Sequence, residues 1–268
     1  MDFTQPIVLP HTELRVGRIG IGSSFGAGAR ELEEAFEHGQ NFFYWGSIRR
    51  PGFGQGIRRL AKRGRERIVV ALQSYTRWPP ALMRLNVETG LLRLGLDHAD
   101  FLILGWWNHH PSPWLLEAAL ELKRKGRVRY LMMSGHNRPF FPEMAKEDVF
   151  DAFMVRYNAV HRGAEEEVFP LLPRDATRPA VVAYTATRWG HLLNPKKTPP
   201  GERTPRASDC YRFCLTRPDV NLVFAGPKNG GEMREALETL KRGPMTEDEL
   251  AWMRRVGDRI HHGARMGD

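Results

Sequence analysis

Side chains that can carry protons or hydrogen-bond to a proton carrier recur at the ends of short apolar runs in this chain. Tyr44 ends NFFY, Gln73 ends IVVALQ, and His136 follows VRYLMMSG. A phenol or an imidazole can act as a general acid or base, and a glutamine amide can hydrogen-bond to either. We therefore take these three residues as the candidate catalytic group, with Tyr44 as proton donor and Gln73 hydrogen-bonded to it. Tyr44 could instead only fill a pocket, and His136 could be a structural hydrogen-bonding residue.

A second set of side chains at the same kind of position could bind substrate. Aromatic rings there would form apolar walls, and cationic or imidazole groups would anchor polar atoms of a ligand. Packing in the core or at the rim is the alternative for the tryptophans. The set is Trp45, Tyr75, Trp106, Trp107, Arg156, His161 and Arg188.

The elements that must position these residues are short apolar runs alternating with longer helical patterns, as repeated βαβ units require. Expected strands are residues 17–22, 41–44, 68–73, 101–105, 128–133, 152–156, 180–185 and 222–225. Helices are expected to begin near Ala27, Gly54, Pro79, Ser112, Pro139, Ala164, Ala207 and Gly231. WLLEAALELKRKG, with its apolar stripe, basic last turn and glycine stop, is typical of a helix that packs on a sheet.

Eight parallel strands joined by helices favour a closed (β/α)8 TIM barrel, whose working site lies at the C-terminal ends of the strands. An open doubly wound sheet is the alternative fold. It is disfavoured because GIGSSFG at residues 20–26 lacks the G-x-G-x-x-G spacing of a dinucleotide-binding turn. EDELAWMRRVGDRI, from Glu247 onward, predicts an additional C-terminal helix outside the barrel.

Length and composition are consistent with one barrel domain spanning residues 1–268. No long apolar segment or leader is recognised, so we expect a cytoplasmic protein with no membrane partner. The net charge of +9 comes from scattered rather than clustered basic residues, so nucleic-acid binding is not expected. Cys210 and Cys214 share one helix face without further ligands nearby, which predicts packing residues and no metal site. Oligomeric state is not predicted.

One long irregular segment, NPKKTPPGERTPR, interrupts the seventh strand-to-helix connection. Loops of this length in compact domains are often functional. We expect residues 190–207 to form a lid over the site, with a solvated surface loop as the alternative.

Several segments together resemble the aldo-keto reductase family, in the right order over roughly residues 13–257. They are GIGSSFG, GQNFFYWGS, LLRLGLDHADFLIL, LKRKGRVRYLMMSGHN, VRYNAVHRGAEEEVFP, GPKNGGEMREAL and GPMTEDELAWM. The resemblance implies a barrel that binds an extended NAD(P)H and reduces carbonyls through an Asp, Tyr, Lys and His tetrad. This chain resembles a divergent member, because Tyr44 stands at the Asp position, Arg49 or Arg50 at the Tyr, Gln73 at the Lys and Gly105 at the His.

The resemblance also implies where the cofactor would bind. Ser134 matches the first residue of the nicotinamide-binding pair, whereas Gly135 and Met154 replace an Asn and a Gln. NADP(H) is favoured over NAD(H), because Lys228 and Arg234 flank a helix N-terminus that could hold an adenosine phosphate. The residues expected to bind cofactor are Ser134, Asn158, Tyr184, Thr185, Gly226, Lys228, Glu232 and Arg234.

These observations favour a divergent oxidoreductase that transfers hydride between NADP(H) and a small carbonyl or alcohol. The changed tetrad leaves two alternatives. One is a catalytically degenerate barrel that binds a nucleotide or metabolite in a regulatory role. The other is a cofactor-independent lyase or isomerase that uses the same strand ends.

Overall fold

The computed structural model describes residues 1–46 and 50–265, and its centre is a closed barrel of parallel strands. The strands are hydrogen-bonded in the order β10-β3-β4-β5-β6-β7-β8-β9. They are β3 (Ile19–Gly22), β4 (Phe42–Trp45), β5 (Val69–Ser74), β6 (Ala99–Leu104), β7 (Val128–Gly135), β8 (Ala152–Arg156), β9 (Ala180–Tyr184) and β10 (Leu222–Ala225). The predicted barrel is confirmed, with strand bounds within about two residues of those expected, and the open sheet is excluded. Arg49 lies outside the described residues.

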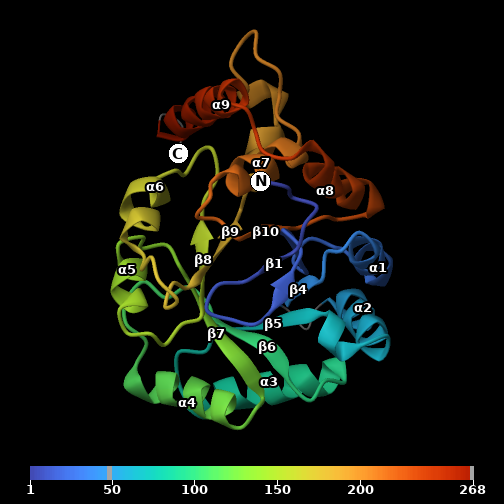
Figure 1. Ribbon diagram of the computed structural model, residues 1–268, viewed down its shortest axis with the longest axis vertical. Helices are drawn as coiled ribbons and strands as arrows, with labels where there is room; N and C mark the ends of the chain where they lie inside the picture. Colours follow the sequence, from blue (N-terminus) through green and yellow to red (C-terminus); the bar gives the residue numbers. More distant parts are fainter. Residues whose placement is uncertain (47–49, 266–268) are drawn as a thin grey trace.

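Helices surround this barrel in the places where the chain must cross between parallel strands (Figure 1). They are α1 (Ala29–Glu37), α2 (Pro51–Lys62), α3 (Pro80–Leu94), α4 (Pro113–Arg124), α5 (Phe140–Ala145), α6 (Ala164–Glu167), α7 (Ala207–Thr216) and α8 (Gly230–Arg242). Short 3₁₀ turns are η1 (Arg65–Arg67), η2 (Phe169–Leu171), η3 (His191–Leu193) and η4 (Pro195–Lys197). Capping side chains explain where two of the helices begin. The Ser112 hydroxyl accepts a hydrogen bond from the Leu115 backbone N–H at the start of α4, and Asn229 caps α8.

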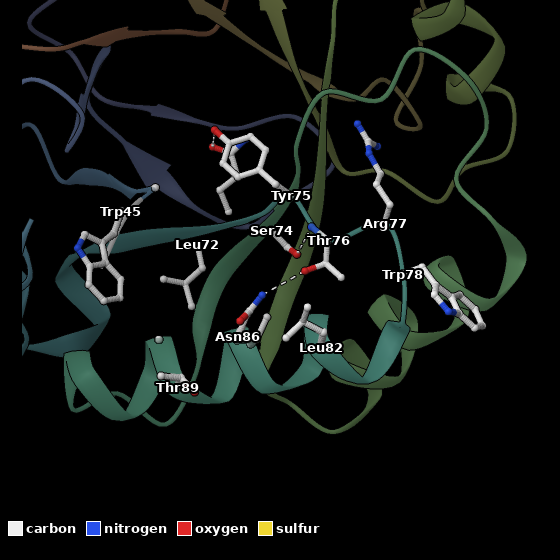
Figure 2. Close-up of a pocket in the computed structure, with 14 residues that line it drawn as sticks. Trp45, Leu72, Ser74, Tyr75, Thr76, Arg77, Trp78, Leu82, Asn86 and Thr89 are labelled. Atoms are coloured by element: carbon white, nitrogen blue, oxygen red, sulfur yellow. Dashed lines mark hydrogen bonds between the residues drawn. The ribbon is translucent and has the colours of Figure 1, made fainter. Parts of the chain in front are cut away.

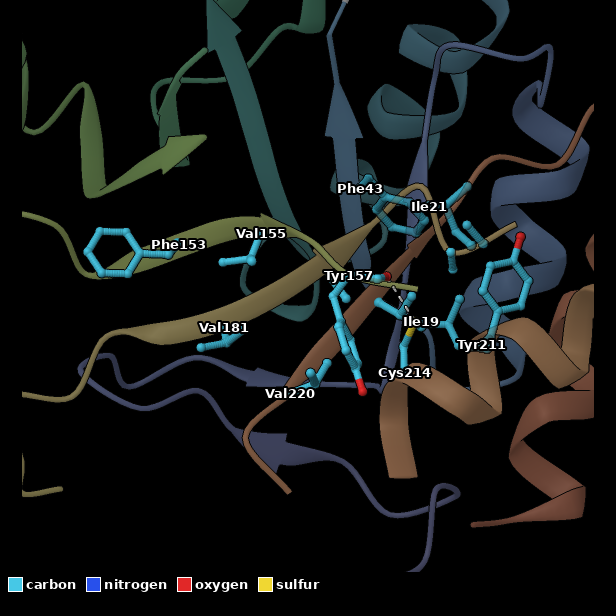
Figure 3. Packing of buried hydrophobic residues seen from close by; sticks show 14 of the residues in the cluster. Ile19, Ile21, Phe43, Phe153, Val155, Tyr157, Val181, Tyr211, Cys214 and Val220 are labelled. Carbon is cyan, nitrogen blue, oxygen red and sulfur yellow. Dashed lines mark hydrogen bonds between the residues drawn. The ribbon is translucent and has the colours of Figure 1, made fainter. Parts of the chain in front are cut away.

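The core has two parts, because successive side chains on a strand point to opposite faces. Phe42, Phe101 and Phe224 pack inside the barrel. Residues of the other parity pack between strands and helices, as Val155 and Val181 do in Figure 3. Both cysteines are buried there, and the Cys214 Sγ lies 3.2 Å from the Tyr157 carbonyl oxygen, as expected of packing residues.

A small N-terminal hairpin, which the sequence pattern did not predict, closes the N-terminal end of the barrel. It consists of β1 (Ile7–Val8) and β2 (Arg15–Val16). Leu9, Leu14 and Val16 belong to the interior cluster. Two-residue strands are too short to produce a recognisable alternation. Since this end is plugged, a ligand site inside the barrel must open at the other end.

The segment from η3 to α7 lies beside the additional C-terminal helix, α9 (Glu247–Arg265) (Figure 1). Arg203 of this segment contacts Trp252 of α9 in two ways. Its guanidinium lies 3.6 Å from the centre of the Trp252 ring, and its backbone carbonyl accepts a hydrogen bond from the Trp252 indole N–H at 3.3 Å. Glu202 forms an ion pair with Arg255 at 2.7 Å. The predicted additional helix is therefore present, and this irregular segment is docked against it.

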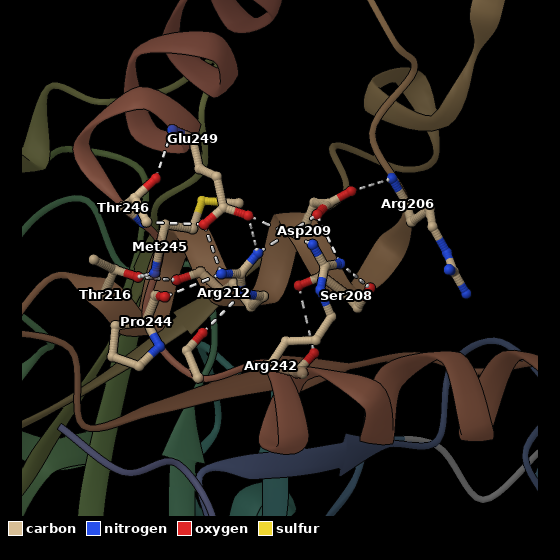
Figure 4. A network of polar contacts seen from close by, with 12 residues as sticks. Arg206, Ser208, Asp209, Arg212, Thr216, Arg242, Pro244, Met245, Thr246 and Glu249 are labelled. Carbon is tan, nitrogen blue, oxygen red and sulfur yellow. Dashed lines mark hydrogen bonds and ion pairs between the residues drawn. The ribbon is translucent and has the colours of Figure 1, made fainter.

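Asp209, in the first turn of α7, is fully buried and joins this segment to the barrel helices (Figure 4). Its carboxylate accepts from the Arg203 side chain at 2.9 Å and from the Arg206 backbone at 2.8 Å. It also pairs with Arg242 of α8 at 2.8 Å. These contacts lower the pKa of Asp209 against the opposing effect of its burial, which is the largest single influence. We call these hydrogen bonds and ion pairs of Asp209 the Asp209 latch. It holds the segment against α8.

Candidate active site

A cavity of about 740 Å³ opens at the C-terminal ends of the barrel strands. This volume is within the range of small-molecule and cofactor sites. Its walls combine strand ends with loops that follow β9 and β10 and with the segment before α7. The predicted site residues that line it are Tyr44, Gln73, Tyr75, Trp106, Ser134, His136, Arg156, Tyr184, Thr185, Gly226, Lys228 and Glu232.

Three neighbouring strands bring His136, Arg156 and Tyr184 together at the rim. Arg156 is the register partner of Tyr184, and Gly135 is that of Val155, so His136 follows beside Arg156. All three share the inward parity of the barrel interior. An imidazole, a guanidinium and a phenol therefore line one wall of the cavity.

Two of these groups are hydrogen-bonded: the Tyr184 hydroxyl oxygen lies 3.1 Å from the His136 Nδ1. Partial burial, and then the charge of Arg156, lower the pKa of His136 below its ordinary value. Burial raises the pKa of Tyr184 to about 12, although Arg156 acts in the opposite direction. Near neutral pH the imidazole is thus mostly neutral and the phenol protonated, so the Nε2 of His136 remains available for proton transfer.

The opposite wall holds Tyr44, Gln73 and Tyr75. The Tyr75 hydroxyl donates to the Gln73 Oε1 at 3.0 Å. Tyr75 therefore makes the hydrogen bond to Gln73 that we expected of Tyr44. The Tyr44 ring packs 5.3 Å from that of Phe224, and Tyr44 is 8% exposed. Burial, with a smaller contribution from Tyr75, raises the pKa of Tyr44 strongly. A phenol with a raised pKa is a weaker acid.

The side chains of Gln73 and Tyr75 explain why position 105 is a glycine. A Cβ at this position would lie 2.3 Å from the Gln73 Nε2 and 2.8 Å from the Tyr75 ring. Any larger residue would require both side chains to move. Gly105, Gln73 and Tyr75 therefore fit one another as a packed group.

The loop after β6 is tied to the end of β7, which sets the position of Trp106. The Trp106 backbone N–H donates to the Ser134 Oγ at 3.1 Å, and that of Trp107 donates to the Ser134 carbonyl at 2.7 Å. Trp106 is 58% exposed and lies 5.1 Å from the Tyr75 ring. A Cβ at Gly135 would lie 2.0 Å from the Trp107 carbonyl oxygen, so this approach requires glycine.

Two tryptophans that we expected in the site point away from the cavity. Trp45 and Trp107 are 5% and 3% exposed and belong to the outer core between strands and helices. Trp45 has the parity opposite to that of Tyr44. Its ring faces Gly54 and Gly90, where an added Cβ would lie in ordinary van der Waals contact with it, at 3.6 and 3.7 Å. The Trp107 ring stacks under the Arg77 guanidinium at 3.8 Å.

Four other expected site residues lie near the cavity but do not line it. Asn158 is buried and donates to the Thr185 carbonyl at 2.9 Å, which supports the positive φ of Thr185. Arg188 lies 3.1 Å from the His191 Nδ1. Arg234 forms a 3.4 Å ion pair with Glu34 on the outer surface. For His161, burial followed by Arg156 and Arg188 lowers the pKa to about 4.

The far end of the cavity contains the expected Lys228 and Glu232 together with residues that the sequence analysis missed. The Glu232 Oε2 accepts the Lys228 backbone N–H at 2.9 Å. Glu235 forms a close ion pair with Arg206 and accepts the Ser208 hydroxyl at 2.6 Å. The missed lining residues include Phe25, Trp189, Leu193, Arg206, Tyr211 and Glu235. Of these, Leu193 and Arg206 lie within residues 190–207, the segment expected to form a lid.

A second hollow of about 600 Å³ lies between the end of β5 and α3 (Figure 2). Gln73 and Tyr75 line both hollows and form part of the wall between them. Asn86 donates to the Thr76 Oγ1 at 3.1 Å, which ties α3 to the loop that carries Tyr75. This hydrogen bond helps to hold the loop that carries Tyr75.

Within residues 1–46 and 50–265, histidine, cysteine, aspartate and glutamate nowhere gather into a group that could hold a metal ion. In the same ranges, every helix is too short or too polar to cross a lipid bilayer.

Three solved structures with a similar fold are of aldo-keto reductases. No protein-family model matches this sequence. The holo form of an aldo-keto reductase from Bacillus halodurans matches with a TM-score of 0.78 and 21% identity, covering 94% of this chain and 96% of that one. Its apo form has a TM-score of 0.76, 23% identity and coverages of 94% and 95%. An aldo-keto reductase from Klebsiella pneumoniae in complex with NADPH has a TM-score of 0.74 and 18% identity, with 94% of each chain covered.

Proposed function

Since this chain has the barrel fold of the aldo-keto reductases, we propose that it is an oxidoreductase that transfers hydride between NADP(H) and a small carbonyl or alcohol. The observation that carries the proposal is the His136–Tyr184 pair, 3.1 Å apart inside a cavity of about 740 Å³ at the strand ends. His136, a group that can carry a proton, thus lies at the C-terminal ends of the strands, where enzymes with this barrel fold have their active sites. The NADPH complex of a protein with the same fold supports the choice of cofactor.

The cavity offers suitable groups for a dinucleotide. Ser134 uses its Oγ to accept the Trp106 N–H, which leaves its own proton to donate to a carboxamide in the cavity. Tyr184 provides an aromatic face at the rim. Lys228 and the N-terminus of α8 provide positive potential for phosphate at the other end. When bound, NADP(H) would supply or accept the hydride.

His136 would carry the proton. Its Nδ1 is occupied by Tyr184, so Nε2 can face the substrate oxygen, and the exposed ring can exchange protons with water. In reduction, the imidazolium donates its proton to the developing alkoxide; in oxidation, the neutral ring accepts it. Tyr184 would act as the positioning residue. Tyr44, with its raised pKa, would instead shape the opposite wall.

The test combines binding with turnover. Titration of the purified protein with NADPH, NADP, NADH and NAD by calorimetry measures nucleotide binding directly, and a panel of aldehydes and ketones then reports oxidation of reduced nucleotide. We expect saturable NADPH binding and turnover that falls at least about tenfold in His136→Gln. Tyr44→Phe should retain activity. Failure to bind any of the four nucleotides would contradict the proposal.

A binding barrel without turnover is the second candidate, because the Gln73 and Tyr75 side chains occupy the space in front of Gly105 and leave no room there for a catalytic side chain. Saturable NADPH binding with no oxidation across the carbonyl panel would favour this function. A loss of activity in Tyr44→Phe with none in His136→Gln would keep the reductase and reassign its proton donor.

A further inference from the structure

Arg156 differs from the other arginine of the cavity in lacking a counter-charge. Arg206 forms an ion pair with Glu235. Within residues 1–46 and 50–265, by contrast, no carboxylate lies within ion-pair distance of Arg156, although its side chain is partly withdrawn from water. Partial burial of an unpaired guanidinium costs free energy, which an anion could recover.

The surroundings of Arg156 are suited to a small ligand rather than to a surface partner. Tyr184 and His136 flank it on the neighbouring strands, and Met154 lies one step deeper on β8. The charge of Arg156 affects both neighbours, because it lowers the pKa of His136 and acts against the rise in that of Tyr184. The unpaired cation therefore stands beside the proposed proton carrier.

We propose that the substrates are carbonyl compounds that also carry a carboxylate, that is, oxo acids or aldehyde acids, and that Arg156 binds the carboxylate. This inference rests on the proposed reductase function of the same cavity. The planar fork of a guanidinium matches the two oxygens of a carboxylate. On reduction, the carbonyl carbon gains hydride from the reduced nicotinamide, which is oxidised, while the carbonyl oxygen gains the His136 proton. The carboxylate remains unchanged.

Kinetics on a matched pair of substrates tests this inference. Succinic semialdehyde and its methyl ester present the same aldehyde with and without the negative charge. A hydrogen-bonded charge pair of about 1.5–3 kcal/mol corresponds to roughly a 10- to 100-fold higher kcat/KM for the acid in the wild-type protein. Arg156→Gln should remove this preference, so that the ratio of kcat/KM for acid and ester falls to about one, whatever the change in the two separate values. Arg156→Lys, which keeps the charge but loses the fork, should be intermediate.

A control variant and a binding measurement complete the test. Arg124→Gln removes an equal charge on the exposed face of α4 and should keep the full preference. Calorimetry with butyrate, a carboxylate that cannot be reduced, should detect binding to the wild-type and Arg124→Gln proteins but not to Arg156→Gln. Butyramide should bind none of them.

The outcomes separate this inference from the proposed function. Equal kcat/KM for acid and ester in the wild type, or an acid preference that persists in Arg156→Gln, would overturn the carboxylate site and leave a reductase of neutral carbonyls. Absence of turnover with both substrates would contradict the reductase instead. In that case the butyrate titration still decides, since equal binding to wild type and Arg156→Gln overturns the inference.

Discussion

At the scale of single residues, His136 combines exposure to solvent with a fixed orientation. Its ring is held through Nδ1 by Tyr184, and Arg156 lies on the neighbouring strand. The hydrogen bond fixes the direction of Nε2, while the positive charge makes the imidazolium a stronger acid. This combination suits a group that must give a proton during reduction and take it back from water.

The environment of His136 gives the proposed reaction a predicted dependence on pH. Because the pKa of His136 is lowered, the imidazolium needed for reduction is scarce at neutral pH, and kcat/KM for reduction should rise as the pH falls toward that pKa. Oxidation needs the neutral ring and should rise with pH through the same range, then level off. Rate profiles in both directions measure this. A reduction rate independent of pH between about 5 and 8 would disagree with proton donation by His136.

The lowered pKa of His161 leads us to expect that pH also affects the free energy of unfolding. Its pKa of about 4 in the folded protein lies below the ordinary value of about 6.5, so the unfolded chain binds more protons between these values. The free energy of unfolding should therefore fall as the pH drops through this window. His161→Gln should lessen the loss between pH 7 and pH 5 by about 2 kcal/mol in denaturant unfolding.

The control for this prediction is His38→Gln on the exposed end of α1. It should leave the difference in unfolding free energy between the two pH values close to that of the wild type. If both variants behave alike, burial of His161 is not the source of the effect.

Residue positions at the strand ends were predictable in part. The inward positions, such as Tyr44, Gln73 and His136, reach the cavity because alternation along each strand fixes the direction of the side chain. Trp45 and Trp107 could not be assigned by type alone, since a tryptophan suits either a pocket or a core. The parity of Trp45 relative to Tyr44 already indicated the core.

At the scale of elements, the segment before α7 is placed by charged contacts. Asp209 accepts hydrogen bonds from Arg203 and from the Arg206 backbone, and it pairs with Arg242. The sequence identified the irregular segment from its prolines and glycine. It did not indicate the latch, because Arg203 and Arg242 are far apart along the chain and basic residues are common throughout.

Loss of the Asp209 contacts should destabilise the protein and loosen the segment before α7. Asp209→Asn leaves Arg203 and Arg242 without their buried partner, and should lower the free energy of unfolding by about 3 kcal/mol. Segment 195–206 should also be cleaved faster by protease. Denaturant unfolding and limited proteolysis measure the two effects. Asp248→Asn, on the exposed first turn of α9, is the matched control, and equal behaviour of both variants would argue against the latch.

At the scale of the whole molecule, the barrel has one end plugged and one end open. The N-terminal hairpin fills the interior below Phe42 and Phe101, and the cavity occupies the other end. The barrel was predictable because eight alternating units leave few topologies for parallel strands. The hairpin was not, since its strands have two residues each. A net charge of +9 adds a long-range field that would attract the anionic cofactor and substrate proposed above.

The central claim is that this cavity transfers hydride, and isotope transfer tests it most directly. NADPH that carries deuterium at the transferable position of its nicotinamide is incubated with the protein and a reducible aldehyde, and the alcohol product is examined by mass spectrometry. The account predicts one deuterium in each product molecule, with much slower formation in His136→Gln. Product without deuterium, or no product although NADPH is bound, would contradict it.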